Sequence, residues 1–277
     1  MGTSNLTINN SKLSMQWLSG FHKRRKKHSL QIVEKPSAVE ENTVSSMLRQ
    51  LHPRVSKAVL VGRSQDGLPV MVEFSDPEIG AILIGCEAGC GKTHQLQVMV
   101  DSALETNAPH ELQIFVLTLN PQEWDRLNQH SYTKNYLYGI HAWYDPRAEV
   151  MIQSLTELAE ARREGGHKGP AVLFVMDDLN FVEDLSLEAQ VNLNWLLAYG
   201  AQSDVWCVST LNAALVPSYR YWVDTYRTRV LGKVNSPKIA ETLAMRPAQH
   251  VSGLQPGEFT VWTGVKWMPY HLPLLGG

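Results

Sequence analysis

Apolar residues follow two different patterns along this chain from about residue 57 onward. Short, uninterrupted apolar runs of strand length alternate with longer segments in which apolar residues recur every three or four positions, as in helices that bury one face. Strands that are buried on both faces have continuous apolar runs, so the alternation predicts an α/β fold with a mostly parallel, twisted sheet and helices on both faces. The expected buried strands are 80–85, 112–119, 171–178 and 205–211, and the expected helices are 94–104, 150–163, 187–201 and 237–244.

Hairpins are expected at both ends of this region. The apolar segments "KAVLVGR" and "LPVMVEF" flank "SQDG", which has the composition of a tight turn. Near the C-terminus, "GEFTVWTGVKWMPYHL" predicts a second hairpin that turns at Gly264. Both would extend the parallel sheet with antiparallel strands.

Residues 1–50 differ from the rest of the chain because they are polar and have no sustained apolar period. We interpret them as a flexible N-terminal arm and residues 51–277 as one folded domain. The basic run "HKRRKKH" (residues 22–28) is either a solvated tail or a contact for phosphates, an anionic surface or a loading partner.

The composition is that of a soluble globular protein. The net charge of −2 gives no general basic field, so DNA binding would need a local patch or a channel formed by several subunits. The chain has no apolar run long enough to span a membrane and no signal-peptide core, which predicts a cytoplasmic location. The three cysteines, Cys86, Cys90 and Cys207, are expected to be free thiols because such a compartment is reducing; a zinc site would lack a second pair of ligands.

The segment "GCEAGCGKT" (residues 85–93), called the glycine-rich loop below, lies between an apolar strand and an amphipathic helix. Backbone amides at such a helix N-terminus bind phosphate, a lysine adds positive charge, and the next hydroxyl binds magnesium. Cys86 replaces the usual first glycine. Because cysteine is small, only the backbone path at the end of the strand has to adjust. Glu87 would be repelled by phosphates and is expected to point outward, toward a neighbouring subunit. The predicted nucleotide-binding residues are Cys86, Glu87, Ala88, Gly89, Cys90, Gly91, Lys92, Thr93 and His94, with Thr93 also on the metal.

A second apolar strand, "AVLFVMDD", ends in two acids about 85 residues further along. This arrangement is typical of phosphohydrolases, in which the first acid holds magnesium and the second orients or deprotonates water. We therefore assign Asp177 to the metal and Asp178 to the water. The alternative for Asp178 is a cap of a helix or turn.

Together these segments resemble the DNA-pumping motors of the FtsK/SpoIIIE and HerA group, a branch of the RecA-like P-loop NTPases. The resemblance covers residues 59–272 and depends on the order of "VGRSQDGLPVMVEF", "AILIGCEAGCGKT", "FVLTLNPQ", "LFVMDDL", "VWCVSTLNA", "YRTRVLGKVNSPKIAETLA" and "LQPGEFTVWTG". It implies a ring, expected to be a hexamer, that uses ATP and Mg2+ to move double-stranded DNA without reading its sequence, with ATP sites between subunits. The architecture would suit a mobile-element, packaging or conjugation role.

The resemblance also shows three departures near the γ-phosphate. The motors have Asp-Pro-Lys where this chain has Asn120, Pro121 and Gln122, and Asp-Glu where it has Asp177 and Asp178. Their sensor strand ends in Gln-Arg, whereas this chain has Leu211 and Asn212; Asn212 could substitute as the polar sensor. Slow or conditional hydrolysis is therefore expected.

Ring motors of this class also use an arginine from the neighbouring subunit to stabilise the transition state. Arg229, in "TRV", matches the family's position and is assigned this catalytic role together with Lys92, Asp178 and Asn212. Arg227 and Arg220 are the alternatives for this role. The competing explanation for each of the three arginines is a surface ion pair without a catalytic role.

Two segments are candidates for contacts with DNA. "RREGGHKGP" matches the position of the family's first DNA loop and offers Arg162, Arg163 and Lys168. "PSYRYWVDTYR" alternates aromatic residues with cations, including Arg220. The competing explanation for its Tyr and Trp side chains is packing against the sheet.

Two other functions remain open from the sequence. One is a nucleotide-binding assembly module of the same fold whose hydrolysis is impaired. The other is a small-molecule phosphotransferase, which would need a lid with convergent arginines, and no such cluster follows the sensor strand.

Overall fold

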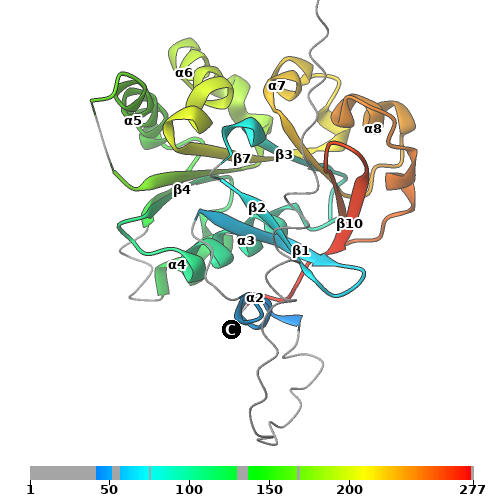
Figure 1. Cartoon of the computed structure of the whole chain (residues 1–277). Helices are drawn as coiled ribbons and strands as arrows, with labels where there is room; N and C mark the ends of the chain where they lie inside the picture. The colour runs from blue at the N-terminus through cyan, green and yellow to red at the C-terminus, as the bar shows by residue number, and fades with distance from the viewer. Residues whose placement is uncertain (1–41, 52–56, 75, 130–136, 167–168, 276–277) are drawn as a thin grey trace, which may run out of the picture.

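The fold is known from a computed structural model, which describes residues 42–51, 57–74, 76–129, 137–166 and 169–275. Its centre is a ten-stranded sheet with the order β2-β1-β10-β9-β8-β3-β7-β6-β4-β5 (Figure 1). The strands are β1 (Ala58–Ser64), β2 (Pro69–Glu73), β3 (Ile82–Cys86), β4 (Leu112–Thr118), β5 (Leu137–Ala142), β6 (Ala171–Asp177), β7 (Val205–Asn212), β8 (Thr228–Leu231), β9 (Glu258–Trp262) and β10 (Trp267–His271).

Helices cover both faces of this sheet, as the sequence predicts (Figure 1). One face carries α3 (Lys92–Thr106) and α4 (Asp125–Gln129). The other carries α5 (Pro146–Arg163), α6 (Leu187–Tyr199), α7 (Arg220–Thr225) and α8 (Pro237–Ala244). Three short 3-10 helices lie near the candidate site: η3 (Pro121–Trp124), η5 (Leu179–Asp184) and η7 (Ala213–Leu215).

The six strands β8-β3-β7-β6-β4-β5 are parallel, and their register aligns the ends that carry the candidate site. Ile84 pairs with Thr210 across β3 and β7, and Thr118 pairs with Asp177 across β4 and β6. Ligands of open α/β sheets bind beyond the carboxyl ends of the strands. This register therefore brings the glycine-rich loop and the acidic pair to one edge of the sheet.

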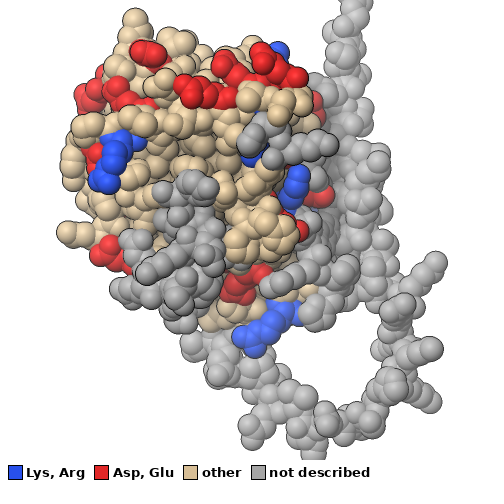
Figure 2. Space-filling model, turned by 90° about the vertical axis from the view of Figure 1, so that its left-hand side faces the viewer, with Lys and Arg blue, Asp and Glu red and all other residues tan. Residues whose placement is uncertain are grey.

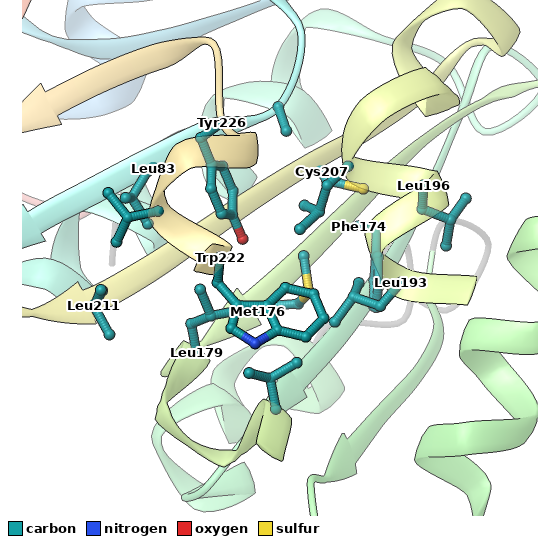
Figure 3. Packing of buried hydrophobic residues seen from close by; sticks show 14 of the residues in the cluster. Leu83, Phe174, Met176, Leu179, Leu193, Leu196, Cys207, Leu211, Trp222 and Tyr226 are labelled. Carbon is teal, nitrogen blue, oxygen red and sulfur yellow. The ribbon is translucent and has the colours of Figure 1, made fainter. Parts of the chain in front are cut away.

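The apolar run of β6 is uninterrupted because both faces of this strand are buried. Successive side chains of a strand point to opposite faces, and both faces of β6 are covered. Phe174 and Met176 pack into the core below α5–α8, while Leu173 and Val175 pack into the core below α3. Figure 3 shows the first of these cores, in which Phe174, Met176, Leu193 and Trp222 pack together. Each fully buried side chain of this size contributes roughly 1.5–3 kcal/mol.

The two predicted hairpins are present and form the antiparallel side of the sheet. Strands β1 and β2 pair around a turn in which Gly67 has φ +85°, and β9 and β10 pair around Gly264, with φ +88°. Positive φ is the backbone conformation that favours glycine at such turns. The hairpin β9–β10 connects β1 to β8 and so joins the antiparallel strands to the parallel ones.

The expected boundary between arm and domain differs from the structure. Residues Val44–Arg49 form helix α2, which Thr43 and Ser46 begin with a capping box. Val44 and Met47 are buried, and the backbone N–H of Leu274 donates to the carbonyl of Asn42 at 2.8 Å. The domain therefore includes residue 42 onward, because α2 packs on it, rather than residue 51 onward. Residues 1–41, with the basic run, lie outside the described part.

Sequence patterning did not predict β5, a short edge strand with only a few apolar residues. It follows residues that the structure does not describe and pairs with β4 alone. In the part of the chain that is described, the helices are too short or too polar to cross a bilayer.

Candidate nucleotide-binding site

The glycine-rich loop connects the carboxyl end of β3 to the first turn of α3. Gly89 and Gly91 have φ values of +75° and +106°, which other residues rarely adopt, and Gly91 directly precedes α3. A Cβ at Gly89 would meet nothing within 4 Å, so Gly89 is required for its backbone conformation rather than for space. The loop thus presents backbone amides at a helix N-terminus, an arrangement that attracts anions.

Asp177 connects the loop to the sensor strand. The hydroxyl of Thr93 donates to Oδ2 of Asp177, and the hydroxyl of Thr210 donates to Oδ1, both at 2.8 Å. Burial raises the pKa of Asp177, and the two hydroxyls and Lys92 oppose that rise. A carboxylate beside a hydroxyl is the all-oxygen donor set that Mg2+ prefers together with nucleotide phosphates, so Thr93 and Asp177 fit the metal.

Lys92 begins α3, and its ammonium group lies inside the loop, where Nζ donates to the carbonyl of Glu87 at 3.4 Å. Burial lowers its pKa, while Asp178 and Asp177 oppose the shift. Its position suits a positive charge that moves from the loop carbonyl onto phosphate oxygens when a nucleotide binds.

Asp178 follows Asp177 at the end of β6 and is half-buried. Burial raises its pKa to about 6, Lys92 opposes this rise, and Asp177 adds to it. Its Oδ1 is buried and accepts no hydrogen bond from any described residue. Asp178 is the residue directly before η5, and the backbone N–H groups of Leu179 and Asn180 also oppose the rise of its pKa, as expected for the predicted alternative role at the start of this turn.

These residues share one pocket of about 370 Å³. Its lining is Gly89, Gly91, Lys92, Thr93, His94, Thr118, Leu119, Asn120, Glu123, Asp177 and Asp178. The structure thus brings together most of the predicted loop residues and both acids. Sequence reasoning missed Glu123, which lies in η3 beyond the end of β4, the strand beside β6. The adjacency of these two strand ends would have identified it.

Two contacts of the loop were not predicted. Glu87 does not line the pocket, and its carboxylate accepts from the backbone N–H of Asn235 at 2.8 Å and from the Asn235 side chain. Cys86 and Cys90 are paired in a disulfide rather than free, because the loop brings their Cα atoms to 6.5 Å, within the span of such a bond. Cys207 is free and buried, and burial raises its pKa to about 12.

The end of the sensor strand offers no side chain to the pocket. Leu211 is fully buried in the core below α5–α8 (Figure 3). Asn212 accepts from the backbone N–H of Ala214 at 3.1 Å and caps η7. The pocket lining does not include it, so in this structure the predicted sensor role of Asn212 has no geometric support.

Arg229, predicted to serve a neighbouring subunit, lies inside its own subunit. Its side chain donates to the carbonyl of Tyr226 at 2.8 Å and contacts Sδ of Met245. It is only 4% exposed, and burial lowers its pKa to about 10. The assignment is therefore corrected, since β8 is covered where Arg229 lies. The alternatives are exposed: Arg220 pairs with Asp224 at 3.7 Å, and Arg227 with Glu78 at 3.8 Å.

The structure separates the predicted DNA contacts. Arg162 is not available to DNA, because its guanidinium donates to the carbonyls of Ser203, Asp204 and Pro170 and holds the start of β6. Arg163 is exposed and lies over the ring of Tyr199 at 5.2 Å. Lys168 lies outside the described residues.

Arg220, by contrast, lies near the edge of the sheet that carries the candidate site. It begins α7, and its neighbour Tyr219 donates to the carbonyl of Asn180, just beyond the acidic pair. Trp222 and Tyr226 are buried in the core, as the packing alternative predicted, whereas Tyr221 is 66% exposed. The two candidate segments therefore do not form one surface.

Comparisons with known proteins show what the fold of this chain resembles. No protein-family model matches the sequence, and no curated protein matches it. The structure is similar to ATPases 2 and 3 of EccC from Thermomonospora curvata in complex with a signal sequence peptide (TM-score 0.64, 14% identity), covering 80% of this chain and 41% of that chain. It is equally similar to ATPases 2 and 3 of EssC from Geobacillus thermodenitrificans (TM-score 0.64, 14% identity, 81% and 46% coverage). The conjugation coupling protein TcpA of pCW3, in monomer form with ATPγS, gives a TM-score of 0.55 at 16% identity, with 78% and 66% coverage.

The chain has the fold of FtsK/SpoIIIE-type ATPases. At these identities the likeness concerns the fold alone, and the chain spans less than half the length of the EccC and EssC structures. The RecA-like fold and the family resemblance expected from the sequence are confirmed. The pocket of this chain lies at the carboxyl ends of β3, β6 and β4, where the chain has its glycine-rich loop and acidic pair.

Proposed function

We propose that this chain is an ATPase that binds MgATP on the glycine-rich loop and couples its hydrolysis to the movement of double-stranded DNA through a cytoplasmic ring, expected to be a hexamer. The observation that supports it most is the network in which Thr93 and Thr210 hold the two oxygens of Asp177 beside Lys92. Lys92, Thr93 and Asp177 line a pocket at a helix N-terminus, where phosphates bind.

The residues divide into three roles at this pocket. Loop amides and Lys92 hold phosphate oxygens, and Thr93 and Asp177 hold Mg2+, which would shield the phosphate charge. Asp178, beyond β6, and Glu123, beyond β4, line the same pocket and are the candidates for orienting the attacking water. A neighbouring subunit would supply an arginine, and the exposed Arg220 is the better candidate now that Arg229 is known to be buried.

The charge distribution restricts where DNA could bind. Residues 42–277 carry 24 Asp and Glu against 18 Lys and Arg, a net charge of −6, whereas residues 1–41 carry 7 Lys and Arg against 3 Glu, a net charge of +4. On the face shown in Figure 2, acidic side chains gather along the upper part and basic ones are few. We propose that DNA is held by exposed cations such as Arg163, by Lys168 and by the basic run, which could instead receive a loading partner.

DNA-stimulated phosphate release tests the proposal, with native protein compared with Lys92→Ala. A motor predicts stimulation by double-stranded DNA that the variant loses, together with ring-shaped particles in negative stain when a non-hydrolysable nucleotide is present. Turnover indifferent to DNA would favour a small-molecule enzyme.

The second candidate is an assembly module that binds ATP and hydrolyses almost none. The burial of Leu211 and the uncharged Asn120 at the pocket favour it, because both leave fewer groups at the γ-phosphate. Nucleotide binding without turnover, with or without DNA, would support this function.

A further inference from the structure

Three carboxylates line the nucleotide pocket, and they differ in whether an oxygen is available to a water molecule. Both oxygens of Asp177 accept hydrogen bonds from threonine hydroxyls. One oxygen of Asp178 is buried inside the protein. Glu123 is exposed, and the contact of its carboxylate is a long one, 3.4 Å from the Asn120 amide nitrogen to Oε1. Glu123 therefore has the most accessible carboxylate oxygens of the three.

The fold holds Glu123 at a fixed place relative to the glycine-rich loop. Gln97, one turn after Thr93 on α3, donates from Nε2 to the backbone carbonyl of Glu123 at 2.7 Å. The backbone N–H of Glu123 donates to the carbonyl of Asn120 at 3.0 Å. One turn of η3 is thereby attached to the same helix whose N-terminus forms the phosphate site.

A second attachment joins the same segment to the acidic pair. The backbone N–H of Leu119 donates to the carbonyl of Asp177 at 3.1 Å, and Thr118 pairs with Asp177 in the β4–β6 register. Both attachments use main-chain atoms of η3 and β4, so the side chain of Glu123 can respond to a ligand while its backbone stays in place. A carboxylate on a fixed backbone at the rim of a phosphate pocket is suited to general-base catalysis.

We propose that Glu123, rather than Asp178, is the catalytic carboxylate that orients and deprotonates the attacking water. The proposal depends on the ATP hydrolysis proposed above. The water oxygen forms a bond to the γ-phosphorus as the bond from that phosphorus to the β–γ bridging oxygen breaks. The water proton passes to a Glu123 oxygen, the electron pair stays on the ADP oxygen, and Glu123 later releases the proton to solvent.

The test compares Glu123→Gln, Asp178→Asn and Asp125→Asn in the full chain, with and without double-stranded DNA. Asp125→Asn is the matched control, because Asp125 is also exposed, begins α4 and does not line the pocket. Calorimetry with MgATP and single-turnover phosphate release separate binding from chemistry. We expect Glu123→Gln to bind MgATP within about three-fold of the native protein and to release phosphate about 10²–10⁴-fold more slowly, with Asp178→Asn less affected and the control unchanged.

Chemical rescue distinguishes a proton acceptor from a structural residue. Added formate should restore part of the rate of Glu123→Ala and none of the rate of Lys92→Ala. A native rate in Glu123→Gln, or a much larger loss in Asp178→Asn, would overturn the assignment while leaving the ATPase proposal intact. Absence of turnover in the native protein would overturn both, and calorimetry would then show whether nucleotide binding survives.

Discussion

Thr93, at the start of α3, and Asp177, at the end of β6, are 84 residues apart in sequence and are joined by a 2.8 Å hydrogen bond. The glycine-rich loop and the acidic strand are thus connected by a side-chain hydrogen bond. The second oxygen of Asp177 is held by Thr210 on β7, which lies between β3 and β6 in the sheet. Helix α3 and strand β7 therefore both bond to the carboxylate at the end of β6.

Replacement of Thr210 by Val should lower the free energy of unfolding. Thr210 is fully buried, and the change leaves Oδ1 of the buried Asp177 without its partner, which costs about 1–3 kcal/mol. The control is Thr260→Val, since Thr260 is equally buried and its hydroxyl has no hydrogen-bond partner among the described residues. Urea denaturation of both variants measures the difference, and equal stabilities would contradict the importance of the network.

The stability of the nucleotide-free protein should depend on pH through Asp178. Its pKa is about 6 in the native state, above the ordinary value of 3.8. Between these values the native state binds more protons than the unfolded state, so the free energy of unfolding falls as pH rises from about 4 to about 6.

Asp178→Asn removes that dependence and should stabilise the fold at pH 7 by roughly 1–3 kcal/mol. Urea denaturation of both proteins at several pH values, without magnesium, measures the pH dependence and the stabilisation. Parallel curves for native protein and variant across this range would show that Asp178 titrates normally.

Restoring the family's glutamine at position 211 should damage the fold rather than complete the site. Leu211 is fully buried in the core below α5–α8, so a glutamine there would bury an amide without partners. We expect Leu211→Gln to lower the free energy of unfolding by roughly 2–4 kcal/mol. Thermal and urea denaturation test this, and a stable variant with faster ATP hydrolysis would show that β7 can turn this side chain toward the pocket.

Arg229→Met should have little effect on folding or on turnover. Nη1 of Arg229 is buried without a hydrogen bond to the described residues, and replacing a buried charge by an apolar side chain of similar size is often neutral or stabilising. Arg220→Met should instead slow DNA-stimulated hydrolysis without changing stability. Steady-state phosphate release and urea denaturation compare the two, and loss of turnover in a folded Arg229→Met protein would return the transition-state role to Arg229.

Local pattern was enough to predict the parallel strands β3, β4, β6 and β7, the flanking hairpins and the glycine-rich loop. Each of these depends on short-range signals: an apolar run, a turn composition, or glycines before a helix. Features that depend on contacts distant in sequence were missed, such as Glu123 in the pocket and Glu87 turned toward Asn235. Arg229 was misassigned for the same reason, because a motif match gives its strand position and not the side chains that cover it.

Helix α2 was missed because six residues give too little periodicity to recognise. Its buried residues Val44 and Met47 pack against Leu60 of β1 and Val98 of α3. Thr43, just before the helix, forms a parallel bridge with Leu274, near the other end of the sequence. His94, in the first turn of α3, contacts the carbonyl of Pro273 at 2.8 Å, next to that bridge.

The bridge means that the chain enters and leaves the domain at one place. A force that pulls residues 42 and 274 apart would act first on two hydrogen bonds, from Val44 to Leu274 and from Leu274 to Asn42. The ten-stranded sheet would bear the force only after these bonds break. Because Pro273 contacts His94, the same pull would act next to the first turn of α3, so a mechanical load could reach the phosphate site within one residue of the bridge.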